Sequence, residues 1–157
     1  MKIRRAEEKD LKRINDLLFQ VAEIHANGRP DIFKKAAKKY TDEELLSIIA
    51  NDETPVFVAA DEADYVLGYA FCIFQNTKNS ILLQDKNTLY IDDICVDEKA
   101  RGEHIGKSLY EYVLAFAEEN NFDNITLNVW NLNEGAYKFY EKCGMKPLKV
   151  TMEKTLK

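Results

Sequence analysis

Residues 91–109 read IDDICVDEKARGEHIGKSL, and this stretch is the most informative part of the chain. It predicts a strand, then a turn that contains glycine, then the first turn of an amphipathic helix. At such a junction several backbone N–H groups and the positive end of a helix dipole point at one spot, which suits a phosphate. Gly102 and Gly106 would let the backbone approach an anion closely, and Arg101 adds positive charge beside the turn. The stretch therefore predicts an anion site at the start of a helix.

The elements around this stretch follow from the spacing of apolar residues. Helices are predicted at 7–27, 41–50, 104–120 and 133–142, and strands at 2–5, 55–60, 65–75, 88–96 and 124–129, with one or two closing strands within 145–154. The best-defined helix, 104–120, has apolar residues along one face: Ile105, Leu109, Tyr112, Val113 and Phe116. Thr41 and Glu44 predict a capping box at the start of the second helix.

The order of these elements predicts the fold class. About seven strands and four helices in this order indicate an α+β domain of three layers, α/β/α, around a mixed, mostly antiparallel sheet. The front half is antiparallel, because the polar residues 61–64 join two apolar runs in a predicted hairpin. The back half contains a parallel βαβ unit. Without a repeat or a linker, residues 1–157 are predicted to form a single domain.

Composition and charge narrow the class of protein. Hydrophobic residues make up 46% of the chain and charged residues 31%, which is ordinary for a globular domain. No apolar run approaches the ~20 residues of a membrane helix, and residues 1–5 do not resemble a signal peptide, so we expect a cytoplasmic protein without a membrane partner. The net charge of −5 argues against a nucleic-acid partner and permits a cationic substrate.

The three cysteines, Cys72, Cys95 and Cys143, are well separated and lie in apolar strand or helix patterns. We expect buried free thiols. No CxxC pair occurs, and the two histidines form no metal motif, so no metal is expected. None of the cysteines has a histidine or basic neighbour that would make it a thiolate, so a cysteine nucleophile is not expected either.

A second stretch, residues 133–145, reads NEGAYKFYEKCGM. With the turn at 101–106, it resembles the GNAT superfamily of N-acetyltransferases, which bind acetyl-coenzyme A. The family's phosphate loop, Gln/Arg-x-x-Gly-x-Gly/Ala, is similar to Arg101 through Gly106, with His104 where glycine is usual. The family's later pattern, Asn-x-x-Ala-x-x-Phe-Tyr-x-x-x-Gly-Phe, is matched by Asn133, Ala136, Phe139, Tyr140 and Gly144, with Met145 in place of the last aromatic residue.

This resemblance implies a sheet that splays between its fourth and fifth strands and a site for acetyl-CoA. The residues implied in coenzyme binding are Ile94, Cys95, Val96, Arg101, Gly102, Glu103, His104, Ile105, Gly106, Lys107, Ser108, Asn133 and Tyr140. Amides near Ile94 would polarise the acetyl carbonyl, and that of Val96 would pair with the pantetheine arm. His104 is read as a tolerated substitution, because histidine is enriched among non-glycine residues with positive φ.

Two carboxylates, Asp92 and Asp93, interrupt the apolar strand before Ile94. Either could take the proton that an alkylammonium, with a pKa of about 10, must lose before it attacks. The pair also resembles the Glu-Asp of polyamine acetyltransferases in this superfamily. Strand alternation selects Asp92 as the residue that shares a face with Ile94, although a bulge would change that parity. In the alternative reading, the carboxylates bond only to backbone, arginine or lysine.

Tyr140 matches the family's general acid, the phenol that protonates the departing thiolate. Because a thiol has a pKa of ~8.5, thiolate departure needs little help, and removal of the hydroxyl should cost roughly ten- to a hundredfold. Helical spacing leaves open that Tyr140 only packs in the core. Residues 25–33, HANGRPDIF, fall in the region that covers the acceptor cleft in this superfamily, or they form a solvated loop.

These observations favour an N-acetyltransferase that moves the acetyl group of acetyl-CoA to a primary amine, expected to be small, by direct attack in a ternary complex. A coenzyme A-binding sensor or scaffold without catalysis is the first alternative, and an acetyltransferase for protein N-termini or lysines is another. A nucleotide-binding domain is less favoured, because neither a complete P-loop nor a strand-first GxGxxG unit is present. The resemblance leaves a homodimer open.

Overall fold

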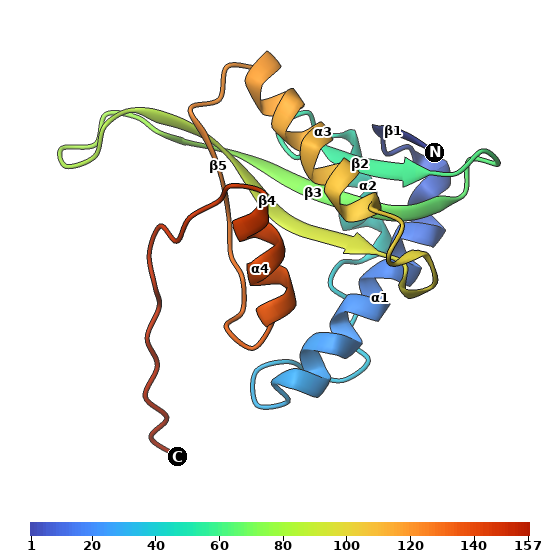
Figure 1. Ribbon diagram of the computed structural model, residues 1–157, viewed down its shortest axis with the longest axis horizontal. Helices are drawn as coiled ribbons and strands as arrows, with labels where there is room; N and C mark the ends of the chain where they lie inside the picture. The colour runs from blue at the N-terminus through green and yellow to red at the C-terminus, as the bar shows by residue number, and fades with distance from the viewer.

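The structure is a computed structural model that describes residues 1–157, and one five-stranded sheet forms its centre. The strands are β1 (Lys2–Arg5), β2 (Val56–Ala60), β3 (Val66–Thr77), β4 (Lys86–Val96) and β5 (Asn124–Leu127). They lie in the order β1-β2-β3-β4-β5, and each neighbouring pair is antiparallel except β4 and β5, which run parallel (Figure 1). The antiparallel front half and the parallel back half of the sheet are confirmed.

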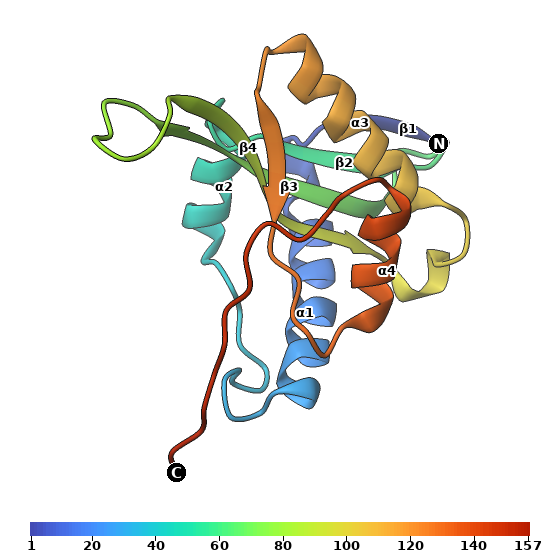
Figure 2. The ribbon, with the colours of Figure 1, turned by 60° about the vertical axis from the view of Figure 1, so that its left-hand side comes forward.

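Helices cover both faces of the sheet (Figures 1 and 2). One buried cluster joins the sheet to α1 (Leu11–Gly28) and α2 (Asp42–Ala50). The other joins it to α3 (Ile105–Glu119) and α4 (Glu134–Lys142). Short 3₁₀ helices precede α1 (η1, Glu8–Asp10) and α3 (η2, Glu98–Ala100). The three-layer architecture is therefore confirmed. No helix combines the length and the apolar character that a membrane span requires.

The predicted capping box at the start of α2 is present. The Glu44 amide donates to the Thr41 hydroxyl at 3.1 Å, and the Thr41 amide donates to the Glu44 carboxylate at 2.9 Å. Each bond satisfies a backbone donor that the first turn of a helix leaves without an intrahelical partner. The two bonds therefore explain why α2 begins at Asp42, directly after Thr41.

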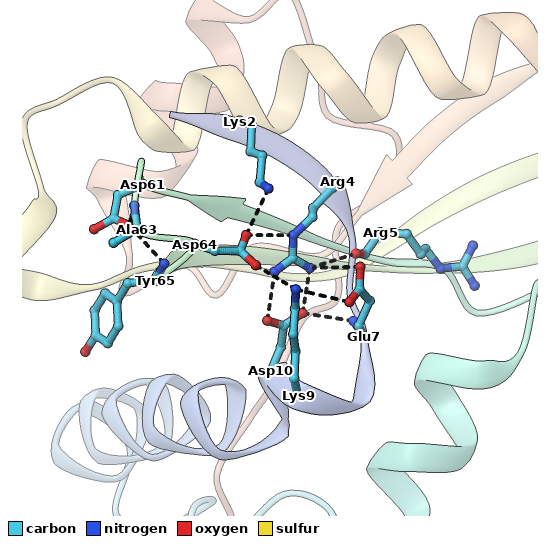
Figure 3. Close-up of polar contacts among 10 residues, drawn as sticks. All are labelled: Lys2, Arg4, Arg5, Glu7, Lys9, Asp10, Asp61, Ala63, Asp64 and Tyr65. Carbon is cyan, nitrogen blue, oxygen red and sulfur yellow. Dashed lines mark hydrogen bonds and ion pairs between the residues drawn. The ribbon is translucent and has the colours of Figure 1, made fainter.

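An ion-pair network holds the N-terminal edge of the sheet in place (Figure 3). The Arg4 guanidinium donates two hydrogen bonds to Asp10, at 2.7 and 2.9 Å, and a third to Asp64 at 3.1 Å. Asp64 also pairs with Lys9 at 2.6 Å and with Lys2 at 3.2 Å. The network links β1, η1 and the β2–β3 turn, so it places the start of α1 relative to the sheet.

The strand count of about seven is wrong, because the sheet has five strands. The closing strands expected within 145–154 do not form, and the chain after α4 leaves the sheet (Figures 1 and 2). It touches the end of α1, where Glu153 pairs with Arg29 at 3.2 Å. In this segment Leu148, Val150 and Met152 are 76%, 75% and 86% exposed. Alternating apolar residues favour a strand, but a strand needs a neighbour, and here the segment lies beside none.

Candidate active site

The site begins where β5 separates from β4. The two strands pair only from Thr88 with Asn124 to Ile91 with Leu127, whereas β4 continues to Val96. The carboxyl-terminal half of β4 therefore has a free edge on the β5 side. This opening confirms the expected splay between the fourth and fifth strands.

The free edge presents backbone donors to the opening. The Asp97 amide donates to the Leu67 carbonyl at 2.8 Å, so it points toward β3. Because successive amides of a strand point in opposite directions, those of Val96 and Ile94 point away from β3, into the opening. A coenzyme arm laid along β4 would meet both donors without any rearrangement of the sheet.

A β-bulge decides where the two carboxylates of β4 lie. Phe71 of β3 pairs with Asp93 and the next residue pairs with Ile91, which leaves Asp92 as the extra residue. Asp92 and Asp93 therefore both face α1 and α2, as their contacts with Tyr40 and Tyr69 indicate. The expectation from strand alternation, that Asp92 shares a face with Ile94, is wrong, because the bulge changes the parity.

The two carboxylates have different partners. Asp92 accepts hydrogen bonds from Lys39 Nζ at 2.8 Å and from the Tyr40 hydroxyl at 3.3 Å. Asp93 accepts one from the Tyr69 hydroxyl at 2.7 Å. Burial raises the pKa of Asp93, and the hydrogen bond from Tyr69 and the charge of Lys39 offset this only in part. Asp93 is therefore a partly buried carboxylate with an increased affinity for a proton.

Tyr140 lies on the α3 and α4 side of the opening. Its ring packs against Phe139 and Tyr110, with ring centres 5.0 and 6.2 Å away. Burial raises the pKa of Tyr140, and the negative charge of Asp93 raises it further. The hydroxyl therefore stays protonated at neutral pH and is able to donate a proton. The ring of Tyr140 is packed, while its hydroxyl makes no hydrogen bond within the chain. Tyr140 can therefore both pack in the core and act at the site.

The turn before α3 forms a cradle of free backbone donors. Gly102 has φ 89° and His104 has φ 59°, so the chain turns through two left-handed residues before the helix starts at Ile105. The amides from Gly102 to Lys107 donate to no group of the chain, and the first intrahelical bond runs from the Ser108 amide to the His104 carbonyl. Such a cradle at a helix N-terminus suits a phosphate.

His104 has a positive φ of 59°, the conformation that the family's usual glycine would supply. Residues Gly106 to Ser108 also match the end of a nucleotide-binding P-loop, but Arg101 stands where that pattern needs its first glycine. Upstream, Asp97 accepts from the Lys99 amide at 3.0 Å and pairs with Arg13 of α1. These bonds hold the end of β4 and the start of the turn in one orientation.

Asn133 acts as the N-cap of α4, because its side-chain oxygen accepts from the Ala136 amide at 3.1 Å. The three cysteines are free. Burial raises the pKa of Cys72 and of Cys95 to about 12 in each case, so neither is a thiolate at neutral pH. The free, unactivated thiols expected from the sequence are therefore confirmed for this pair.

Three aromatic residues cluster where α1 ends. The Phe33 ring lies 4.9 Å from His25 and 5.2 Å from Trp130, between ring centres. They bring together the end of α1, the α1–α2 loop and the β5–α4 loop. Sequence reasoning singled out residues 25–33 but not Lys39 or Tyr40, which reach the site from a loop 52 or more residues before Asp92. No local pattern marks such a contact.

Comparison with known proteins places this geometry in a family. The family model described as "Acetyltransferase (GNAT) family" matches residues 18–145. The chain is 28% identical over 137 residues to "Probable N-acetyltransferase san" of Drosophila melanogaster, covering 87% of this chain and 61% of that protein. It is 32% identical over 94 residues to "Peptidyl-lysine N-acetyltransferase YjaB" of Escherichia coli (strain K12), covering 60% of this chain and 51% of that protein. The chain thus spans less than two thirds of either relative.

Among solved structures, a mutant of the BH1408 protein from Bacillus halodurans is 31% identical and has a TM-score of 0.95. That match covers 99% of both chains. Since the family model covers most of the described residues, and the anion cradle and the splayed strands fall inside it, the chain belongs to the acetyltransferase (GNAT) family.

Proposed function

We propose that this protein is an N-acetyltransferase that moves the acetyl group of acetyl-CoA to a primary amine. One observation carries the proposal: the opening between β4 and β5 lies between free backbone donors and a pair of carboxylates. The donors suit the phosphates, the pantetheine arm and the acetyl oxygen of the coenzyme. The carboxylates suit an ammonium.

The coenzyme binds through backbone groups in this proposal. Its pyrophosphate accepts hydrogen bonds from the amides of Gly102 to Lys107, with the positive end of the α3 dipole beneath it. Arg101 adds charge beside the turn. The pantetheine arm pairs with the Val96 amide as an extra strand would. This leaves the thioester at Ile94, whose amide is fixed before charge develops on the acetyl oxygen.

The amine enters from the face of α1 and α2. Asp92 and Asp93 hold its ammonium, and Asp93 takes a proton from it directly or through water, since its raised pKa makes it the better base. The neutral nitrogen then attacks the thioester carbon in a ternary complex. Tyr140 donates a proton to the departing thiolate from the other side of the opening.

The test measures coenzyme binding and turnover separately. We expect calorimetry to detect binding of acetyl-CoA, and a panel of amines to contain at least one that releases free thiol at a saturable rate. The panel includes small amines, peptides with free N-termini and peptides with internal lysines, so that the protein-directed alternative is tested as well. Binding without thiol release across the panel would favour the sensor or scaffold; absence of binding would remove the proposal.

We also propose that the protein forms a homodimer through its C-terminal segment. Leu148, Val150 and Met152 alternate with polar residues and are exposed, while the outer edge of β5 has no neighbour. An unpaired edge is a template for another strand. The segment 146–157 of a second copy fits this edge, with its apolar residues on the side of α3 and α4.

Light scattering tests this assembly. The intact protein should have the mass of a dimer, and a variant that lacks residues 147–157 should be a monomer with unchanged helix content by circular dichroism. A Val150→Lys variant keeps the length of the chain but puts a charge on the apolar face, so it should also be a monomer. A monomeric intact protein would contradict the dimer and leave the proposed activity untouched.

A further inference from the structure

Lys39 places an amine at the carboxylates of the candidate site. Its Nζ atom lies 2.8 Å from Asp92 Oδ2 and 5.3 Å from the centre of the Tyr40 ring. The charge of Asp93 also acts on it, and its own charge acts on Tyr90 of β4. The ammonium of Lys39 therefore lies beside the two carboxylates that are proposed to hold the ammonium of the acceptor.

No other lysine has this position. The remaining lysine ion pairs lie elsewhere: Lys2 with Asp64, Lys9 with Asp64 and Glu7, Lys12 with Asp16, Lys38 with Asp42 and Lys107 with Glu111. Lys38 is the informative neighbour, because it is adjacent in sequence and also paired with an aspartate, but that aspartate begins α2. The chain thus contains a matched internal control for Lys39.

The distance from this ion pair to the proposed acetyl position is short. Asp92 and Ile94 are two residues apart on β4, which corresponds to about 7 Å along a strand. Lys39 belongs to the segment between α1 and α2, which has no regular secondary structure, and its side chain has four rotatable methylene groups. A change of rotamer would carry Nζ from Asp92 toward a thioester held at the Ile94 amide.

We propose that Lys39 is a site of self-acetylation. The inference rests on the proposed function, because it uses the same bound acetyl-CoA. The Lys39 ammonium gives one proton to a neighbouring carboxylate, and the neutral nitrogen attacks the carbonyl carbon of the thioester. An N–C bond forms and the C–S bond breaks. Of the two protons that the nitrogen gives up in all, one ends on the coenzyme thiol and the other in solvent.

Self-acetylation has a consequence for the site. Acetyl-lysine carries no charge, so the ion pair with Asp92 is lost once Lys39 is modified. Asp92 and Asp93 are then both free for an external ammonium. The modified protein should therefore bind a cationic acceptor more tightly than the unmodified one.

The experiment incubates the full-length protein with acetyl-CoA and no added amine, and quantifies acetylated peptides by mass spectrometry over time. We expect acetyl-Lys39 to form about tenfold or more faster than acetyl-Lys38, at a rate constant that does not depend on protein concentration. Lys39→Arg should lose this label, and Lys38→Arg should keep it. Asp92→Asn should slow it by about tenfold or more, without changing the slow labelling of exposed lysines.

Equal rates at Lys38 and Lys39 would overturn the inference, as would a rate constant that rises in proportion to protein concentration. Calorimetry with coenzyme A and thiol release with external amines are measured on the same samples. If both are positive and Lys39 is unlabelled, only the self-acetylation fails. If coenzyme binding is absent, the proposed function fails with it.

Discussion

Two aspartates of this protein, the buried Asp10 and the partly buried Asp93, have opposite environments. Asp10 is 4% exposed and accepts two hydrogen bonds from Arg4. Burial alone would raise the pKa of Asp10, but the bonds from Arg4 and from the Glu7 amide outweigh it, and the pKa is lowered. Asp93 has only the neutral hydroxyl of Tyr69 as a hydrogen-bond partner, and burial raises its pKa.

The comparison shows the same side chain in two environments, one suited to structure and the other to the proposed chemistry. A carboxylate paired with a guanidinium is held in one charge state and one orientation, so it fixes the geometry of the chain. A partly buried carboxylate with a neutral donor keeps a strong affinity for protons, which is what a base needs. The N-terminal network of Figure 3 is the first case, and the opening beside β5 is the second.

The largest expected effect is on catalytic activity, and it distinguishes Asp93 from Asp10. Asp93→Asn should lower kcat/KM for an amine by about 10²- to 10⁴-fold, because the amide cannot take the proton, while Tyr69 keeps its hydrogen bond. Asp10→Asn should leave turnover per folded molecule within about threefold. Thiol release at pH 7 measures both. Equal losses in the two variants would mean that Asp93 is structural as well.

The free energy of unfolding should show the reverse order, with the larger loss in Asp10→Asn. Asp10→Asn leaves the Arg4 guanidinium with Asp64 and the more distant Glu7, and the loss should be about 3 kcal/mol of unfolding free energy, the low end for a broken buried ion pair. Denaturant unfolding followed by circular dichroism measures it. An Asp10→Asn variant as stable as the native chain would show that these two carboxylates are enough to neutralise Arg4.

Tyr140→Phe should lower kcat roughly ten- to a hundredfold with little change in KM, because the hydroxyl acts only on the departing thiolate. Tyr110→Phe is the matched control, since its ring is a direct neighbour of Tyr140 on the same side of the opening. It should change kcat within about threefold. A larger loss in Tyr110→Phe than in Tyr140→Phe would transfer the role of acid to Tyr110.

The smallest effect is the pH dependence of stability, and its sign differs between the two aspartates. The lowered pKa of Asp10 stabilises the fold above the unfolded value of about 3.9, and this contribution is lost as pH falls through the folded pKa. The raised pKa of Asp93 stabilises the fold below about 3.9, and this contribution is lost as pH rises through the folded pKa.

Melting temperatures check these signs. At pH 7, Asp93→Asn should melt above the native protein and Asp10→Asn below it. Both differences should shrink toward pH 3, where the native carboxyls approach the neutral form that asparagine imitates. An Asp93→Asn variant that melts below the native protein at pH 7 would mean that the charged carboxylate is favoured in the fold.

Local signals were sufficient for much of the fold and for part of the site. The Thr41 and Glu44 capping box starts α2 as predicted, and the turn before α3 has the positive φ at His104 that its pattern required. The splay of β4 and β5 was expected from the family resemblance. The strands expected after Met145 were wrong, because alternation describes a strand but does not provide its neighbour.

Patterns of neighbouring residues were enough to predict the helices, the antiparallel and parallel halves of the sheet and the cradle of amides at Gly102 to Lys107. The directions in which Asp92 and Asp93 face, and the contact of Lys39 with Asp92, could be seen only in the folded chain. A bulge and a contact between distant segments depend on how β3 and the α1–α2 loop pack against β4. The chemistry of the site depends on both.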